Sequence, residues 1–115
     1  MKLPGIKLFD LTDQVAIITG GSKGLGLAMA AGLASAGCKT VIVNRNVVEG
    51  EAAVKELNED YDPQSIFIAA DVTNEDQINK MVAEVFEKYG RIDILINSAG
   101  INIRGAIDEL TYDDF

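Results

Sequence analysis

The sequence predicts an α/β fold, in which a doubly wound parallel sheet is built from strands that alternate with helices. Four short apolar runs, rich in β-branched residues, are separated by longer segments of helical composition or periodicity. A glycine cluster follows directly on the first apolar run, which is typical of a strand that turns at once into a helix. Alternation of this kind requires right-handed crossovers and therefore parallel strands.

The first half of the chain is expected to contain two strands and two helices. The apolar runs at residues 15–18 and 40–43 predict buried parallel strands. Residues 25–36 are rich in Ala and Leu and stop at Gly37, which predicts a helix that ends there. Residues 48–58 predict a second helix, and we expect its sheet-facing side to consist of Val48, Ala52, Ala53 and Leu57.

The second half continues as strand, helix and strand. Residues 65–70 and 92–96 predict the two strands. The helix between them has Thr73 as its expected N-terminal cap and Gly90 as its end. Its apolar positions repeat at helical spacing and comprise Ile78, Met81, Val82, Val85, Phe86 and Tyr89. We expect strand order 3-2-1-4, with the first two helices on one face of the sheet and the third on the other.

Composition excludes several classes of protein. The chain has 115 residues, 48% of them apolar, and a net charge of −8, which suits one globular domain and argues against nucleic-acid binding. There is no histidine and one cysteine, Cys38, so we expect no metal site, no disulfide and no catalytic thiol. No signal peptide or transmembrane run is visible, and we expect a cytoplasmic protein with no membrane partner.

Charge is distributed unevenly along the chain. Residues 1–45 carry a net charge of +3 and residues 46–115 a net charge of −11, and residues 14–48 contain no acid at all. This acid-free segment has two interpretations. Either an anion binds there, or the segment is mostly buried and excludes charge of either sign.

The turn between the first strand and the first helix, residues 19–26, reads TGGSKGLG. Free N–H groups at a helix start, together with the helix dipole, bind phosphate, and glycine allows close approach of a pyrophosphate. Leu27 and Ala28 follow the last glycine, so the segment fits neither the Walker A pattern nor G-x-G-x-x-G. It fits T-G-x-x-x-G-x-G. The alternative is that these glycines merely permit a tight turn.

Four landmarks in order resemble the short-chain dehydrogenase/reductase family over essentially the whole chain. They are LFDLTDQVAIITGG at residues 8–21, the glycine turn, Asp71-Val72 after the third strand, and RIDILINSAG at residues 91–100. The resemblance implies that residues 1–115 form a partial NAD(P)-binding domain of the Rossmann type, truncated after its fourth strand, with no second domain.

The resemblance also implies which residues bind the cofactor. The glycine turn would hold the pyrophosphate through Gly20, Ser22, Gly24, Leu25 and Gly26. Thr19 is expected to brace the central strands instead.

Further cofactor contacts are implied at the ends of the later strands. Asp71 would accept a hydrogen bond from the adenine amino group and Val72 would lie against the ring, although Asp71 could instead cap the following helix. Asn97, Ala99 and Gly100 would run beneath the riboses, and Ser98 stands where the family commonly has a second Asn.

The end of the second strand bears on which cofactor binds. An acid there would bind the ribose 2′-hydroxyl of NAD, but this chain has Asn44, followed by Arg45. Arg45 and Lys23 both suit a 2′-phosphate, so we expect NADP rather than NAD. The alternative for Arg45 is an ordinary exposed loop residue.

The family's chemistry uses a Tyr with a Lys four residues later, and a Ser. None of Tyr61, Tyr89 and Tyr112 has that Lys, so we assign no catalytic residue. We expect an N-terminal part of a longer oxidoreductase that acts on a small carbonyl or secondary alcohol, is homo-oligomeric at full length and is inactive as this chain alone. The alternative is a complete short nucleotide-binding protein without catalysis.

Three segments resemble the gluconate 5-dehydrogenase and 2-deoxygluconate 3-dehydrogenase groups, namely LFDL, VNRN and GINIRG. In the last of these, Arg104 could attract a substrate carboxylate or could be an ordinary exposed residue.

Overall fold

The computed structural model describes residues 5–61 and 64–98, so Ala99, Gly100 and Arg104 lie outside the described residues. A short 3-10 helix comes first, and strands then alternate with helices. The elements in chain order are η1 (Gly5–Phe9), β1 (Val15–Thr19), α1 (Gly24–Ser35), β2 (Lys39–Asn44), α2 (Val47–Asp60), β3 (Ile66–Ala69), α3 (Glu75–Tyr89) and β4 (Ile94–Asn97).

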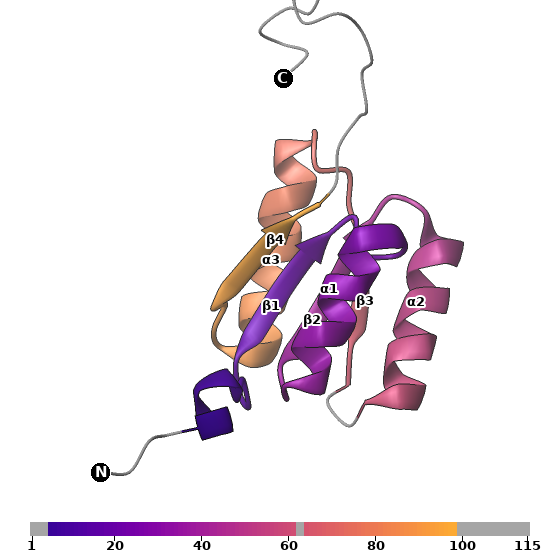
Figure 1. Cartoon of the computed structure of the whole chain (residues 1–115). Coiled ribbons are helices and arrows are strands. Elements are labelled where there is room, and N and C mark those ends of the chain that lie inside the picture. The colour runs from indigo at the N-terminus through magenta and orange to yellow at the C-terminus, as the bar shows by residue number, and fades with distance from the viewer. Residues whose placement is uncertain (1–4, 62–63, 99–115) are drawn as a thin grey trace, which may run out of the picture.

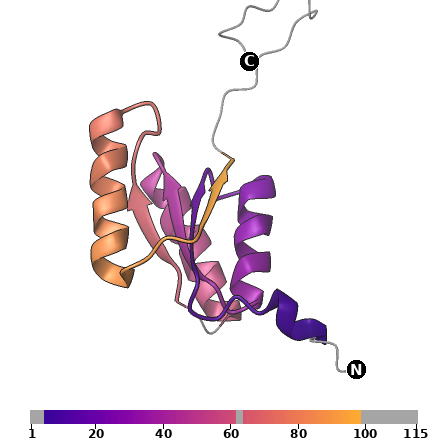
Figure 2. The same ribbon diagram turned by 90° about the vertical axis from the view of Figure 1, so that its left-hand side faces the viewer.

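The sheet has the predicted topology. Its order is β3-β2-β1-β4 and every pairing is parallel. In the central register, Ile17 of β1 pairs with Val41 of β2 on one side and with Leu95 of β4 on the other. Helices α1 and α2 lie on one face and α3 on the opposite face (Figures 1 and 2). The chain is therefore doubly wound about β1.

Strand alternation divides the core into two clusters. Val15 and Ile17 of β1 pack toward α3, whereas Ala16 and Ile18 pack toward α1 and α2. All five residues of β1 are buried, as expected for a central strand covered on both faces. The α3 cluster further includes Val41, Val43, Ala70, Met81 and Val85, and the other cluster includes Ala30, Cys38, Ile42 and Leu57.

Cys38 is a packing residue. It is fully buried, and its thiol donates to the Gln14 carbonyl over 3.4 Å. Burial raises the pKa of this thiol to about 11, and the negative charge of Asp93 contributes in the same direction. The thiol is therefore protonated at neutral pH, the unreactive form of a cysteine.

The expected cap of α3 was wrong by one residue. Asn74 is the N-cap, and its side-chain oxygen accepts from the Gln77 amide over 3.1 Å. Thr73 instead donates its hydroxyl to the Asp71 carboxylate over 2.7 Å. Asp71 and Thr73 thus form a local turn ahead of the helix, and this turn uses the hydroxyl that the capping box would have needed. The expected end at Gly90 is confirmed, with φ +73°.

The expected sheet-facing side of α2 was also partly wrong. Ala53 and Leu57 are buried as expected, but Val48 is 79% exposed and Ala52 is exposed. The third buried position is Gly50, where an added Cβ would lie 2.1 Å from the Phe67 ring. The Phe67 ring of β3 occupies the space that a side chain at position 50 would fill. The buried side of α2 is therefore centred on Gly50, Ala53 and Leu57 and not on the predicted apolar residues.

Part of the α3 face remains uncovered. Val82 and Phe86 of α3 are 40% and 58% exposed, and Leu95 of β4 is 66% exposed. Leu95 shares the α3 face of the sheet, because it pairs with Ile17. Within residues 5–61 and 64–98, β4 pairs with β1 alone, and no helix there combines the length and apolarity needed to cross a bilayer.

Replacing Gly50 with Ala should destabilise the fold, because the new methyl group would overlap the Phe67 ring. Overpacking of this kind costs about 1–3 kcal/mol. Gly32 of α1 is the matched control, since nothing lies within 4 Å of an added Cβ there, and Gly32→Ala should instead stabilise by up to about 1 kcal/mol. Urea unfolding measures both variants, and equal effects would contradict the packing argument.

The isolated 115-residue chain should self-associate through Val82, Phe86, Leu95 and the outer edge of β4, because exposed apolar surface beside the edge of a sheet recruits other chains. Sedimentation velocity should show concentration-dependent association that Phe86→Lys combined with Leu95→Lys abolishes. Val48→Lys, at an exposed apolar residue of α2, is the control and should leave association unchanged. A monomer at every concentration would refute this prediction.

Candidate functional site

The turn between β1 and α1 is held in a conformation that favours glycine. Gly20 and Gly24 have φ values of +67° and +60°, in the left-handed region that other residues rarely adopt. The Gly20 amide donates to the Val43 carbonyl over 2.8 Å. The turn is thereby seated on the carboxyl end of β2.

Gly26 allows the first turn of α1 to approach the end of β1. A Cβ at this position would lie 2.3 Å from the Gly20 carbonyl oxygen, a distance that no side chain tolerates. Gly26 itself is buried. The helix start and the glycine turn are therefore in backbone contact, and no Cβ separates them.

The N-terminus of α1 differs from those of the other two helices. Its N-cap residue, Lys23, makes no side-chain cap hydrogen bond, and its first turn contains no acid. Helices α2 and α3 are capped by Asn46 and Asn74 and carry acids in their first turns. The first N–H groups of α1, including that of Leu25, have no partner within the helix. With the positive end of the dipole, this backbone suits an anion.

Two side chains connect the glycine turn to the end of β2. The Asn44 amide donates to the Ser22 hydroxyl, and the Asn44 oxygen accepts from the Arg45 amide over 2.9 Å. Ser22 is 8% exposed and Arg45 is exposed. Asn44 therefore occupies the position at the end of β2 where an acid would bind a ribose in an NAD enzyme. Its side chain is held by Ser22 and Arg45 and carries no negative charge.

A salt bridge that the sequence did not predict spans the same place. The Lys23 ammonium lies 3.7 Å from the Glu49 carboxylate, in the first turn of α2. Glu49 is the first acid after the acid-free segment of residues 14–48. Within that segment, Lys23 is therefore not the uncompensated charge that the composition indicates. The one available signal was the position of Glu49 in a helix first turn.

Asp71 lies in the turn between β3 and α3. One of its oxygens accepts from the Thr73 amide over 2.9 Å and from the Thr73 hydroxyl over 2.7 Å. These bonds lower the pKa of Asp71, and the positive charge of Arg45 contributes further. The carboxylate is thus ionised. It organises the turn ahead of α3, and it retains capacity for another donor, because a carboxylate offers about four acceptor sites. Val72, beside it, is 40% exposed.

Thr19 links β1 to β4. Its hydroxyl donates to the Asn97 side-chain oxygen over 2.8 Å, and its carbonyl accepts from the Ser98 amide over 3.1 Å. The expected bracing role of Thr19 is confirmed. The Ser98 hydroxyl lies 3.0 Å from the position of a Cβ at Gly26, so Ser98, directly after β4, closely approaches the start of α1.

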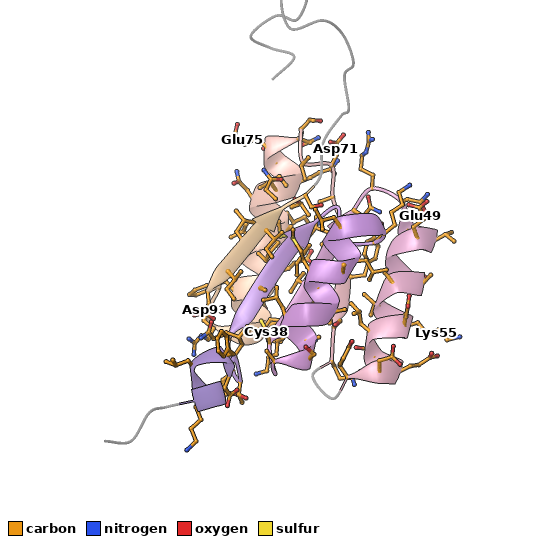
Figure 3. All side chains as sticks on the ribbon, viewed as in Figure 1. Cys38, Glu49, Lys55, Asp71, Glu75 and Asp93 are labelled. Carbon is orange, nitrogen blue, oxygen red and sulfur yellow. The ribbon has the colours of Figure 1, made fainter. Side chains whose placement is uncertain are left out.

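These residues gather at one end of the sheet, called the carboxyl edge here and formed by residues 19–26, 44–46, 70–74 and 97–98 (Figure 1). Glu49 and Asp71 lie at this end, whereas Cys38 and Asp93 lie at the opposite end (Figure 3). The order in which strands are added to the sheet reverses at β1, since β2 and β3 lie on one side of it and β4 on the other, and ligands of open α/β sheets bind at such a switch point. In the described ranges, no three His, Cys, Asp or Glu side chains are grouped so as to hold a metal ion.

Comparison with solved structures finds the same fold in reductases and dehydrogenases. The complex of L-sorbose reductase from Gluconobacter frateurii with NADPH and L-sorbose has a TM-score of 0.81 and 33% identity, over 91% of this chain and 40% of that one. The 2-keto-3-deoxy-D-gluconate dehydrogenase of Streptococcus agalactiae has a TM-score of 0.76 and 34% identity, over 92% and 40%.

Sequence comparison gives relatives of wider chemistry. The 15-hydroxyprostaglandin dehydrogenase (NAD(+)) of Homo sapiens is 37% identical over 93 residues, which are 80% of this chain and 35% of that protein. The chain spans between 35% and 44% of the length of the curated relatives it matches. The family model for the short chain dehydrogenase matches residues 14–115. With its glycine turn and parallel sheet, this chain belongs to the short-chain dehydrogenase family.

Proposed function

We propose that this chain is the N-terminal, cofactor-binding part of a cytoplasmic, NADP-dependent oxidoreductase that acts on a small carbonyl or secondary alcohol. The observation that carries the proposal is the uncapped N-terminus of α1. There Gly26 packs against the Gly20 carbonyl, with no room for a side chain between them. Two relatives differ from each other in the cofactor that their names state, NADPH for one and NAD(+) for the other, so the family alone leaves the choice between NADP and NAD open.

The described residues divide the binding task among themselves. The backbone of Gly24, Leu25 and Gly26, with Gly20 and the Ser22 hydroxyl, would hold the pyrophosphate. Asp71 would accept from the adenine amino group, and Val72 would cover the ring. Asn97, followed by Ala99 and Gly100, would border the riboses. When bound, the nicotinamide supplies or takes up the hydride, and these residues fix its place relative to the sheet.

The preference for NADP rests on the end of β2. Asn44 offers no carboxylate to a ribose 2′-hydroxyl, since its oxygen accepts from the Arg45 amide and its amide donates to Ser22. Arg45 and Lys23 are the cations nearest to this place in sequence and topology. A guanidinium fork suits a phosphate dianion, which supports NADP as the cofactor.

The rest of the proposed enzyme follows from the relatives' length. Because this chain spans less than half of each, we propose that the catalytic Ser, Tyr and Lys, and the contacts of a homo-oligomer, belong to sequence beyond it. A sugar or sugar acid is the proposed substrate, supported by the names of the two structural neighbours. A reading frame that continues into Ser and Tyr-x-x-x-Lys motifs would support this, and a stop codon after Phe115 would favour a short nucleotide-binding protein.

Gly26→Ala should weaken cofactor binding in the full-length protein, because its methyl group would push α1 away from the Gly20 carbonyl. We expect the dissociation constant for NADPH, measured by fluorescence titration, to rise at least about tenfold, a loss of about 1.4 kcal/mol. Gly32→Ala on the same helix is the control and should bind as the parent does. Equal binding by both variants would refute a phosphate site at this turn.

Arg45→Asp should shift cofactor preference toward NAD, because it adds repulsion to a 2′-phosphate and supplies an acceptor for a 2′-hydroxyl. The measurement is kcat/KM for both cofactors in the full-length parent and variant. We expect the ratio of kcat/KM for NADP to kcat/KM for NAD to fall by at least about tenfold. An unchanged ratio would mean that Arg45 does not contact the cofactor's phosphate.

A further inference from the structure

At or beside the carboxyl edge, four charged side chains form two pairs of opposite sign. Lys23 forms its salt bridge with Glu49 over 3.7 Å, and the positive charge of Arg45 acts on Asp71. The two cations that favour a 2′-phosphate therefore each have an acid nearby. The four together carry no net charge, so this place attracts an anion less strongly than Lys23 and Arg45 alone would.

Glu49 is held in place by the start of α2. It is the third residue of that helix, and its backbone amide donates to the Asn46 side chain over 3.1 Å. A carboxylate in a helix first turn is stabilised by the dipole. The Glu49 side chain is 41% exposed and the Lys23 side chain 79% exposed, so Lys23 is the partner more accessible to a ligand.

The salt bridge itself contributes little to stability. Exposed ion pairs are screened by solvent and restrict two long side chains. The salt bridge matters instead for the affinity of a charged ligand at this place. Lys23 belongs to the start of α1 and Glu49 to the start of α2, so the pair spans the two helices that follow β1 and β2, on either side of the place where a ribose 2′-position is bound.

A 2′-phosphate would meet this pair in two ways. It would have to draw Lys23 away from Glu49, and it would be repelled by the Glu49 carboxylate that remains. A 2′-hydroxyl carries no charge and meets neither obstacle. The pair therefore discriminates between the two cofactors at the single group in which they differ.

We propose that Glu49 is a specificity-determining residue, which weakens binding of NADP(H) by competing for Lys23 and so brings the affinities for NADP(H) and NAD(H) closer together. This inference rests on the proposed function. It differs from the roles of Lys23 and Arg45, which favour NADP, because Glu49 acts against them.

The test is an equilibrium titration of the full-length protein with NADPH and NADH, and with two half-cofactors, adenosine 2′,5′-bisphosphate and adenosine 5′-monophosphate. Glu49→Gln should tighten NADPH and the bisphosphate by roughly three- to tenfold at low ionic strength, and less at high salt. NADH and the monophosphate should change less than about twofold. Glu51→Gln removes the same charge two residues along α2 and should change none of the four.

The outcomes separate the inference from the function beneath it. If the parent binds NADPH but Glu49→Gln and Glu51→Gln behave alike, the role of Glu49 is overturned and the proposed function stands. If Glu49→Gln instead weakens NADH, then Glu49 accepts from the ribose 2′-hydroxyl and the inference is wrong in sign. If the parent binds neither cofactor, the proposed function fails and the inference fails with it. In the Lys23→Gln background, the gain from Glu49→Gln should shrink, and an undiminished gain would overturn competition for Lys23.

Discussion

The contact between Gly26 and the Gly20 carbonyl is the constraint on which the site depends. A Cβ at Gly26 would lie 2.3 Å from that oxygen, so the helix can start this close to the strand only without a side chain. Because the approach is so close, the chain between β1 and α1 must turn sharply, which requires positive φ at Gly20 and Gly24. The same sharp turn leaves the first N–H groups of α1 directed out of the carboxyl edge.

Polar side chains then hold neighbouring strand ends in fixed positions around this turn. Thr19 bonds to Asn97 across β1 and β4, and Ser22 bonds to Asn44 across the turn and β2. Each such bond contributes about 1 kcal/mol, which is small against the burial of β1. Their value lies in positioning, since they place the ends of three strands relative to the helix start. Asn44 serves this purpose without the charge that an acid would bring to a phosphate site.

Local patterns predicted most of the fold, and spatial neighbours explain what they missed. The strands were predictable because their β-branched runs are buried on both faces, as β1 shows. The inward side of α2 was misassigned because Gly50 has no apolar side chain to count, although the Phe67 ring fills its place. The cap of α3 is Asn74 and not Thr73, because the Thr73 hydroxyl donates to the Asp71 carboxylate. The salt bridge of Glu49 with Lys23 joins two helices across the sheet edge, so no periodicity within one element contains it.

The two sides of β1 differ in the polar contacts at their strand ends and in how much apolar surface they expose. On the side of β2 and β3, the end of β2 is bonded to the glycine turn, and Glu49 and Asp71 are acids near Lys23 and Arg45. On the side of β4, the face carries Leu95 at 66% exposure beside Phe86 at 58%. In the proposed function, the adenosine half of the cofactor would lie on the side of β2 and β3 and the nicotinamide half on the side of β4, since the two halves of a dinucleotide bind on either side of the switch point. In the proposed enzyme, the described residues would therefore contribute to cofactor recognition, whereas the orientation of a substrate would depend on groups that adjoin β4.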